Sequence, residues 1–414
     1  KGALRFLKLH TKYLFAFFPF FSKEDNMKKL FSVLAFCALL SLRQSDSKEI
    51  VDQFAFLAGI QLNGPDPTDI QVKDNRFYDR VLKDKSLGFG ESYMAGWWDV
   101  DELDECMFRI IRADVESRFK KSPSFYWAYL KAKLLNKQDK AGSLEVIQKH
   151  YQLGNDLYRA MLDPTMTYSC GYWKNAKNLE EAQLAKYDLI ARKLGIKKGM
   201  RVLDIGCGWG GFAKYIAVHY GAKVTAITLS ENQAIVARET CKDLDVEVRV
   251  QDYRDINEKF DRIVEIGMFE HVGQKNYREF MEICYKSLQD GGMVMLHTIG
   301  SNRTITVSDE WTNKYIFPGG HLPSIAEVGR SIEGLFVMED WHNFGTHYDK
   351  TLMAWFKNFD SHWGELKDNY SPEFYRMWKY YLLSCAGSFR ARSIQLWQVV
   401  LVKNGVLSGY ETVR

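Results

Sequence analysis

The chain lacks the sequence features of several common classes of protein. It is neither repetitive nor fibrous, and it shows no C-x-x-C pair and no metal-ligand spacing. Its cysteines are odd in number, which argues against a disulfide framework; the seven are Cys37, Cys106, Cys170, Cys207, Cys241, Cys284 and Cys385. We therefore expect a reducing, cytosolic compartment and no metal site.

Neither sign of charge dominates the body of the protein. Residues 1–47 hold eight Lys/Arg and three Asp/Glu, so residues 48–414 hold 48 basic and 49 acidic side chains. The net charge of +4 thus comes from residues 1–47 and gives no support for nucleic-acid binding. The composition, 46% hydrophobic and 26% charged over 414 residues, is typical of a globular protein of two or three domains.

A glycine-dense turn follows an apolar predicted strand at residues 202–211, which read VLDIGCGWGG. Gly206 and Gly208 would let the backbone approach a ligand, and a helix from about Gly211 would aim its N-terminal amides into the same crevice. A plain strand-to-helix turn is the alternative interpretation. Asp204 would repel the diphosphate of a dinucleotide but suits a cationic ligand. The pattern resembles motif I of the S-adenosylmethionine (SAM) methyltransferases.

Strand and helix patterns alternate from residue 195 to about residue 300. Strands are expected at residues 201–205, 223–228, 246–250, 262–266 and 293–297, with helices at 212–220, 231–243 and 277–289. Parallel strands with crossover helices predict a doubly wound, Rossmann-like α/β sheet, in which ligands bind at the carboxyl ends of the strands. Side chains that directly follow a strand are therefore candidate site residues.

The parts before and after this region are less regular. Residues 48–138 are expected to form a smaller mixed α+β domain, with a helix at 47–59, extended pieces at 70–81, further helices and a lysine-rich linker at 131–143, ahead of a catalytic domain at 139–414. Trp97 and Trp98 suit either a membrane interface or a core, and composition favours the core. Beyond residue 300 the chain is rich in aromatic residues, which can line an acyl-chain pocket but more commonly fill a core.

Two kinds of polar side chain follow the fourth and fifth predicted strands. Glu270 comes shortly after the fourth strand, and His297 ends the fifth. A carboxylate and an imidazole that converge on the crevice can position a base or a small anion, although a buried Glu–His pair can also serve only to hold loops together. Their position at two strand ends favours catalysis. The Asn-Pro-Pro-Tyr motif of nucleobase amine methyltransferases is absent here, which argues against DNA as the substrate.

Several ordered motifs together resemble the family of cyclopropane-fatty-acyl-phospholipid synthases, over about residues 48–414. They lie at residues 168–173, 202–211, 228–233, 251–255, 267–272, 296–300, 314–318, 341–345 and 389–398. The resemblance implies a class I SAM methyltransferase domain behind an N-terminal lipid-docking domain. It also implies transfer of a methylene group from SAM to cis double bonds in phospholipid acyl chains, through a carbocation that bound bicarbonate deprotonates.

The resemblance implies two sets of site residues. The bicarbonate set is Cys170 and Ile299, through backbone groups, Glu270 as the proton acceptor from bicarbonate, and His297 and Tyr348 as orienting hydrogen-bond partners. For Cys170, the role of a small buried hydrophobe is equally compatible. The SAM set is Tyr168, Ser169, Asp204, Gly206, Gly208, Thr228, Gln233 and Gln251.

The end of the second predicted strand departs from the pattern of many methyltransferases. Many such enzymes have an acid there that binds the ribose hydroxyls, but this strand runs into Thr228 and Leu229. Gln233 is expected to substitute for that acid. Asp252, after the third strand, is expected either to contact adenine or only to cap a turn.

The resemblance also implies the setting of the enzyme. Its partner would be a phospholipid bilayer, approached as a peripheral protein at the cytoplasmic face of the cell membrane, and it would form a homodimer. Two alternatives stay open: a lipid C-methyltransferase that makes methyl-branched acyl chains, and a SAM- or lipid-binding module without catalysis.

Residues 1–47 stand apart from the rest of the chain. A 13-residue apolar run at residues 30–42 follows Met27-Lys28-Lys29, as in a secretion signal, but no clear cleavage site follows it, and the run is short for a membrane span. A membrane-surface anchor, a targeting segment and translated upstream sequence remain as interpretations. We favour the last, because export would separate a SAM enzyme from its cytosolic cofactor.

Overall fold

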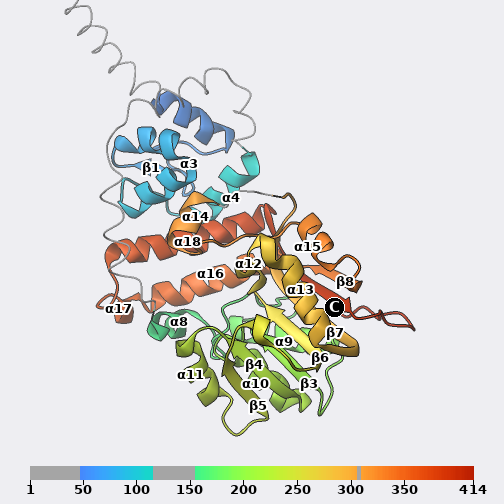
Figure 1. The fold of residues 1–414 in the computed structure, drawn as a ribbon. Coiled ribbons are helices and arrows are strands. Elements are labelled where there is room, and N and C mark those ends of the chain that lie inside the picture. Colours follow the sequence, from blue (N-terminus) through green and yellow to red (C-terminus); the bar gives the residue numbers. More distant parts are fainter. Residues whose placement is uncertain (1–46, 115–153, 305–308) are drawn as a thin grey trace, which may run out of the picture.

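The centre of the molecule is a seven-stranded sheet, seen in a computed structural model that describes residues 47–114, 154–304 and 309–414 (Figure 1). Its strand order is β5-β4-β3-β6-β7-β9-β8. The strands β3 to β7 are parallel, and β9 pairs antiparallel with both β7 and β8. Their bounds are β3 Arg201–Ile205, β4 Lys223–Thr228, β5 Val246–Val250, β6 Phe260–Ile266, β7 Leu288–Ser301, β8 Val337–Asn343 and β9 Ile394–Val402. The predicted doubly wound α/β fold is confirmed.

Helices cover both faces of this sheet. On one face, α9 (Leu179–Lys193) and α10 (Gly211–Tyr220) share an apolar cluster with β3 and β4. On the other face, α13 (Tyr277–Ser287) and α15 (Ile325–Ile332) pack against β3, β6 and β7. The remaining elements around the sheet are α8 Asn155–Met161, α11 Glu231–Thr240, η1 Tyr253–Asp255, α12 Phe269–Val272, η2 Gln274–Asn276, α14 Glu310–Tyr315, α16 Thr346–Ser361, α17 Trp363–Leu366 and α18 Pro372–Arg390.

Side-chain caps start several of these helices where the sequence changes from strand to helix. The Asn178 side chain accepts a hydrogen bond from the Glu181 amide at the start of α9, and Ser230 accepts one from the Gln233 amide at the start of α11. Such caps satisfy amides that the first helical turn leaves without a partner. The cap at Ser230 also fixes the turn that follows β4, where the sequence predicts cofactor contacts.

The part of the chain before the sheet, which we call the N-terminal segment (residues 47–114), is mainly helical. It contains a helix at residues 47–57, β1 (Gln71–Val72), α3 (Arg76–Met94), β2 (Trp98–Asp99) and α4 (Leu103–Ala113). The expected extended pieces at 70–81 are correct only at β1. From Arg76 the chain is helical because Phe77, Tyr78 and Leu82 recur at helical spacing, which buries all three on one face.

Trp98 belongs to the core of this segment. Its side chain is buried, its indole Nε1 donates to the Phe89 carbonyl oxygen at 3.1 Å, and its ring lies 4.3 Å from the Phe89 ring. Trp97 instead lies beneath the Arg76 guanidinium, 4.4 Å from the ring centre. The core interpretation of the tryptophan pair is therefore confirmed for Trp98.

The expected linker at residues 131–143 and the expected domain boundary near residue 138 lie outside the described residues, as do residues 1–46. Within the described residues, the N-terminal segment shares one apolar cluster with α16 and α18. Figure 1 shows α18 between the N-terminal segment and the rest of the chain.

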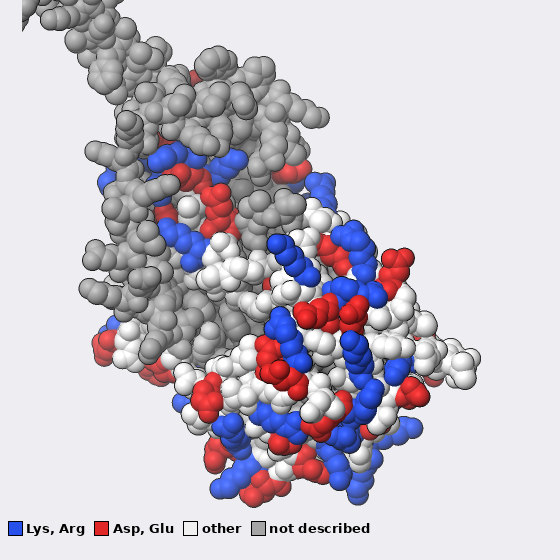
Figure 2. All heavy atoms as spheres, in the orientation of Figure 1, with Lys and Arg blue, Asp and Glu red and all other residues white. Residues whose placement is uncertain are grey.

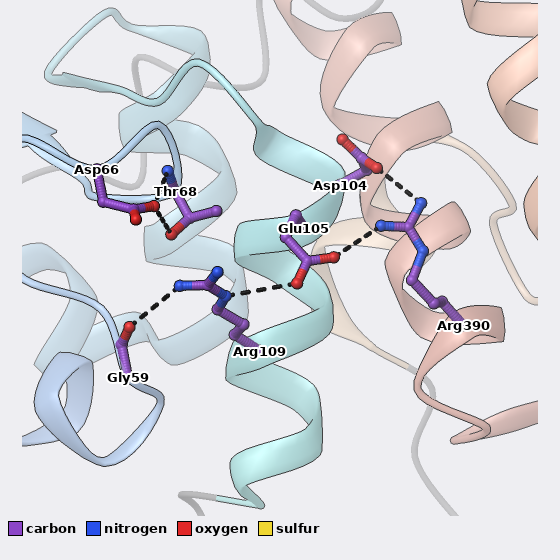
Figure 3. Close-up of polar contacts among 7 residues, drawn as sticks. All are labelled: Gly59, Asp66, Thr68, Asp104, Glu105, Arg109 and Arg390. Atoms are coloured by element: carbon purple, nitrogen blue, oxygen red, sulfur yellow. Dashed lines mark hydrogen bonds and ion pairs between the residues drawn. The ribbon is translucent and has the colours of Figure 1, made fainter.

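Two arginines of α18 hold the N-terminal segment. Arg390 forms ion pairs with Asp104 at 2.7 Å and Glu105 at 3.0 Å, both in α4, and Figure 3 shows these contacts reaching across from one helix to the other. Arg376 Nη2 donates to the Trp98 carbonyl oxygen at 2.9 Å and to Asp99 at 2.7 Å. Partly buried arginine contacts of this kind fix orientation as well as adding stability.

The distribution of charge on the visible described face agrees with the near-neutral body expected from the sequence. Figure 2 shows Lys and Arg interspersed with Asp and Glu over the visible described face, without a large region of one sign. In residues 47–114, 154–304 and 309–414, we find no helix with both the length and the apolar character of a membrane span.

A glycine pair tests the close contact between α18 and α4. A Cβ atom at Gly387 would lie 2.7 Å from the Asp104 carbonyl oxygen, whereas one at Gly329 in α15 would meet nothing within 4 Å. We expect Gly387→Ala to lower the free energy of unfolding by about 1–3 kcal/mol, since the backbones must separate. Gly329→Ala, the matched control, should raise it by about 0.5–1 kcal/mol. Chemical denaturation measures both, and stabilisation by both substitutions would contradict the contact.

Candidate functional site

A cavity of about 450 Å³ opens at the carboxyl ends of β3, β4, β5 and β6. All eight residues predicted to contact SAM line it: Tyr168, Ser169, Asp204, Gly206, Gly208, Thr228, Gln233 and Gln251. The turn after β6 adds Gly267, Met268 and His271 to the lining. The structure thus brings together one predicted set in a single hollow, at the sheet edge where the fold predicts a ligand.

The glycines after β3 are required by the backbone path. Gly206 has a φ of +79° and Gly208 a φ of +54°, a region that side chains with a Cβ rarely adopt. A Cβ at Gly206 would also lie 3.0 Å from the Met268 Cβ. The amides of Gly206 and Cys207 both donate to the Ile227 carbonyl oxygen, so the turn is fixed against β4.

Asp204 presents an acceptor to the cavity. The side chain is 2% exposed, and its Oδ2 is buried without a hydrogen-bond partner among the described residues. Burial raises the pKa of Asp204 to about 7, and the Lys186 charge opposes that rise. An ionised carboxylate only accepts hydrogen bonds, so this position fits a donor such as an ammonium group.

The turn after β4 orients Gln233. Thr228 Oγ1 donates to Gln233 Oε1 at 2.9 Å, which leaves the Gln233 amide nitrogen to act as a donor. Asp252 lines the same cavity, and its carboxylate accepts from the Arg254 amide at 2.8 Å. The turn-cap interpretation of Asp252 is confirmed, and its contact with adenine stays a prediction.

Glu270 lies beside the cavity in a dry environment. It is 6% exposed, its Oε1 accepts from the Ile299 amide at 2.6 Å, and its Oε2 is buried without a partner in the described part of the chain. Burial raises the pKa of Glu270 to about 7, although the hydrogen bond from Ile299 opposes the rise. Glu270 and Ile299 are therefore in contact through the Ile299 amide, and their binding of bicarbonate stays a prediction.

His297 is a neutral donor on the neighbouring strand. It is 1% exposed, and the Gln398 side-chain amide lies 3.2 Å from its Nδ1. If Gln398 Nε2 donates to Nδ1, the proton of the ring is on Nε2, which is buried and has no partner within the described residues. Burial, with the charges of Lys186 and Lys193, lowers the pKa of His297 well below its usual value, so the ring is uncharged.

Cys170 and Tyr348 complete the second predicted set. Both are buried, and the Tyr348 ring stacks on Phe389 with 4.6 Å between ring centres. Burial holds the pKa of Tyr348 well above its ordinary value, so its hydroxyl stays protonated. Burial also raises the pKa of the Cys170 thiol, which stays protonated and is not a nucleophile. None of the five residues of this set lines the cavity itself.

Two buried ionisable residues at the site were not predicted from the sequence. Glu265, in β6, accepts hydrogen bonds from the amides of Met268 and Phe269, and so holds the start of the helix that carries Glu270. The available signal was an acid within the apolar second half of β6, residues 263–266. Lys186, in α9, lines the cavity and is fully buried; its signal was a lysine on the apolar face of a helix.

Comparison with known proteins gives a consistent result. The family model described as mycolic acid cyclopropane synthetase matches residues 138–399. The cyclopropane-fatty-acyl-phospholipid synthase of Escherichia coli is 51% identical over 368 residues, which cover 88% of this chain and 95% of that protein. The cyclopropane mycolic acid synthase MmaA2 of Mycobacterium tuberculosis is 36% identical over 278 residues, 63% of this chain and 97% of its own.

Solved structures agree with these sequence matches. The crystal structure of the mycolic acid cyclopropane synthase CmaA1 complexed with S-adenosylhomocysteine (SAH) and CTAB has a TM-score of 0.57 at 35% identity, and covers 62% of this chain and 97% of its own. Coclaurine N-methyltransferase, at 22% identity, has a TM-score of 0.61 and covers 77% of this chain and 99% of its own, which shows a shared fold only.

The cost of burying the Glu270 carboxylate predicts how substitution of Glu270 changes the stability of the fold. Its pKa is about 7 in the folded protein against an ordinary 4.5, so the folded state increasingly disfavours the ionised group as pH rises from 4.5 to 7. We expect Glu270→Gln to increase the free energy of unfolding by about 2–3 kcal/mol at pH 8. The increase should vanish below pH 4.5, where both states of the wild type are protonated.

In the same denaturation experiments, Asp340→Asn is a control for which the free energy of unfolding should change in the opposite direction. Its ion pairs with Lys193 and Arg414 lower the pKa of Asp340, so the native carboxylate stabilises the fold above its usual pKa of 3.8. The Asn variant should be less stable than the wild type at neutral pH. A Glu270→Gln variant that is destabilised at pH 8 would contradict the burial argument.

Proposed function

The chain belongs to the mycolic acid cyclopropane synthetase family and is a SAM-dependent transferase; from this premise, we propose that it is a cyclopropane-fatty-acyl-phospholipid synthase. It would transfer a methylene group from SAM to cis double bonds in the acyl chains of membrane phospholipids. One observation carries the proposal: a cavity lined by the predicted SAM residues lies next to Glu270 and His297, and each of these has one buried polar atom, Oε2 and Nε2, without a partner among the described residues.

The cavity has the chemistry that SAM requires. Asp204 would accept from the ammonium group of its methionine part, and the positive-φ turn at Gly206 lets the backbone approach the ligand. Gln233 would donate from its amide nitrogen to the ribose hydroxyls. When bound, SAM supplies an electrophilic methyl group on a positively charged sulfur.

The reaction needs a base after the carbon–carbon bond forms. The alkene π electrons form a bond to the methyl carbon as the carbon–sulfur bond breaks, which releases SAH and leaves a cation on the acyl chain. Loss of a proton from the new methyl group then supplies the electron pair that closes the ring. The base must lie close to that methyl group, in a place where water cannot capture the cation.

We propose that the base is a bicarbonate ion held by Glu270 and His297. The two vacant hydrogen-bonding atoms are complementary, because Glu270 Oε2 accepts and the neutral His297 Nε2–H donates. Bicarbonate has one O–H donor and several acceptor oxygens, so it fits both. A pKa of about 7 lets Glu270 accept the bicarbonate proton near neutral pH, which makes the ion a stronger base.

Aromatic side chains keep this place dry. Tyr348 lies against Phe389 and meets Trp355 edge-on, with ring centres 5.8 Å apart. Tyr168, one of the cavity-lining residues, hydrogen-bonds through its hydroxyl to Tyr381 at 2.6 Å. We propose that this wall excludes water from the cation, and that Cys170 contributes only backbone groups.

The substrate would set the location of the enzyme. Phospholipid acyl chains lie in a bilayer whereas SAM is soluble, so we propose a peripheral protein at the cytoplasmic face of the cell membrane, docked through an N-terminal domain. Phe56 is 80% exposed at the end of the helix at residues 47–57, and supports a lipid contact there.

We also propose that the protein forms a homodimer. The edge strand β8 exposes Val337 and Met338, which suits pairing with a second copy of the chain.

A second candidate is a lipid C-methyltransferase. A relative from Pseudomonas putida, 36% identical over 279 residues, carries the name probable fatty acid methyltransferase. The same cation would serve both reactions, which differ in where the proton is lost. The buried base at Glu270 and His297 favours ring closure.

Labelled acyl chains distinguish the candidates. The full chain is incubated with methyl-labelled SAM, bicarbonate and vesicles of a cis-unsaturated phospholipid, and the lipids are examined by NMR for ring protons. We expect cyclopropane signals from the wild type and a decrease of about 10²–10⁴-fold for Glu270→Gln, because the base loses its proton acceptor. SAM affinity should stay within a few-fold.

Glu258→Gln is the matched control for this assay. Glu258 precedes β6 and pairs with Arg201 at the start of β3 and with Arg249 in β5. It does not line the cavity, and its loss should leave activity near the wild-type value. Labelled methyl branches would favour the methyltransferase. SAM binding without transfer of label to any acyl chain would contradict the proposed function.

A further inference from the structure

Helix α9 buries two lysines one above the other. Lys186 and Lys193 are seven residues apart, which places them on the same face of the helix, and they are 0% and 1% exposed. A buried ammonium group is costly unless an acid or a set of hydrogen bonds compensates it. The two lysines differ in how this is achieved.

Lys193 has its acid within the protein. Its Nζ lies 3.1 Å from the Asp340 carboxylate, which Arg414 also contacts, and 3.1 Å from His342 Nδ1. The Lys193 ammonium group therefore has its hydrogen-bond and ion-pair partners within the protein. Lys193 does not line the cavity.

Lys186 has no such acid. Its Nζ donates to Ser169 Oγ at 2.5 Å, and no carboxylate of the described residues lies within ion-pair distance of it. The charges of Asp163 and Asp204 act on it only from farther away, and burial lowers the pKa of Lys186 to about 7. Unlike Lys193, it faces the cavity, where a ligand can supply the missing negative charge.

The contact between Lys186 and Ser169 also fixes what Ser169 can do. An ammonium group has no acceptor, so the Ser169 oxygen must accept from it, and the hydroxyl hydrogen of Ser169 is left to donate elsewhere. Ser169 and Lys186 therefore present donors only. Asp204, on the wall of the same cavity, presents an acceptor.

This arrangement complements an α-amino acid, which carries one carboxylate and one ammonium group. We infer that Lys186, through its own ammonium group and the Ser169 hydroxyl, binds the α-carboxylate of SAM. The α-ammonium group of SAM would lie on the other side and donate a hydrogen bond to Asp204. The inference rests on the proposed use of the cavity for SAM and adds a residue to its binding set. It assigns to α9 a direct part in selecting ligands with an intact amino-acid end.

Binding of SAM and of decarboxylated SAM tests this assignment, since the two ligands share the sulfonium and ammonium groups and differ in the carboxylate. By calorimetry, the wild type should bind SAM about 10- to 100-fold more tightly than the decarboxylated ligand. Lys186→Met should reduce this preference to less than about threefold by weakening SAM binding alone. Retained binding of the decarboxylated ligand shows that the variant is folded.

Lys193→Met is the matched control, because it removes an equally buried lysine of the same helix and should keep the preference of the wild type. An unchanged preference in Lys186→Met would overturn the assignment, and so would equal binding of both ligands by the wild type, a result that needs no variant to fold. Failure of the wild type to bind either ligand would overturn the proposed function together with this assignment. Loss of lipid turnover with normal binding preferences would affect the proposed function alone.

Discussion

The exclusion of water from ionisable side chains is the constraint on which the site depends. In the described part of the chain, such groups lie at or behind the carboxyl ends of the strands, and those at most 6% exposed include Lys186, Asp204, Glu265, Glu270 and His297. Burial moves the pKa of each toward its neutral form. Lys186, Asp204 and Glu270 each have a pKa of about 7, so small changes in bound charge decide their protonation. A zwitterionic cofactor and a small anion supply such charges.

Parallel strand pairing places these groups together. Ile205 pairs with Glu265, and Ile266 pairs with His297, so residues distant in the sequence reach one edge of the sheet. The turn after β6 then folds back so that Glu270 accepts from the Ile299 amide beyond β7. The acid that holds this turn, Glu265, is itself part of the strand. Geometry and charge are therefore set by the same few residues.

The parallel half of the fold was predicted well, because short segments with strand patterns alternate there with turns and helical segments. The strands β3, β4 and β5 have the predicted bounds, and the predicted SAM residues share one cavity. The strands β8 and β9 were not predicted, because they pair antiparallel with partners far along the chain.

Long-range burial explains the remaining differences. The sequence marks Lys186 only as a lysine on the apolar face of a helix, and its place in the cavity depends on elements far along the chain. The roles of the bicarbonate residues came from resemblance rather than from local pattern. The extended prediction failed from Arg76 onward because the apolar residues there follow a helical period. Local patterns report which face of an element is buried, but not what that face will meet.

Helix α18 contacts two parts of the protein, the N-terminal segment and the wall of the cavity. One part of it carries Arg376, Gly387 and Arg390 against the N-terminal segment, while Tyr381 contacts the cavity residue Tyr168. The matched family region begins at residue 138, after that segment. A family member that consists of the matched region alone has to cover this side of the helix with other side chains. Arg376 and Gly387 therefore serve the contact with the N-terminal segment, Arg390 serves that contact and also pairs with Asp349 of α16, and Tyr381 serves the cavity.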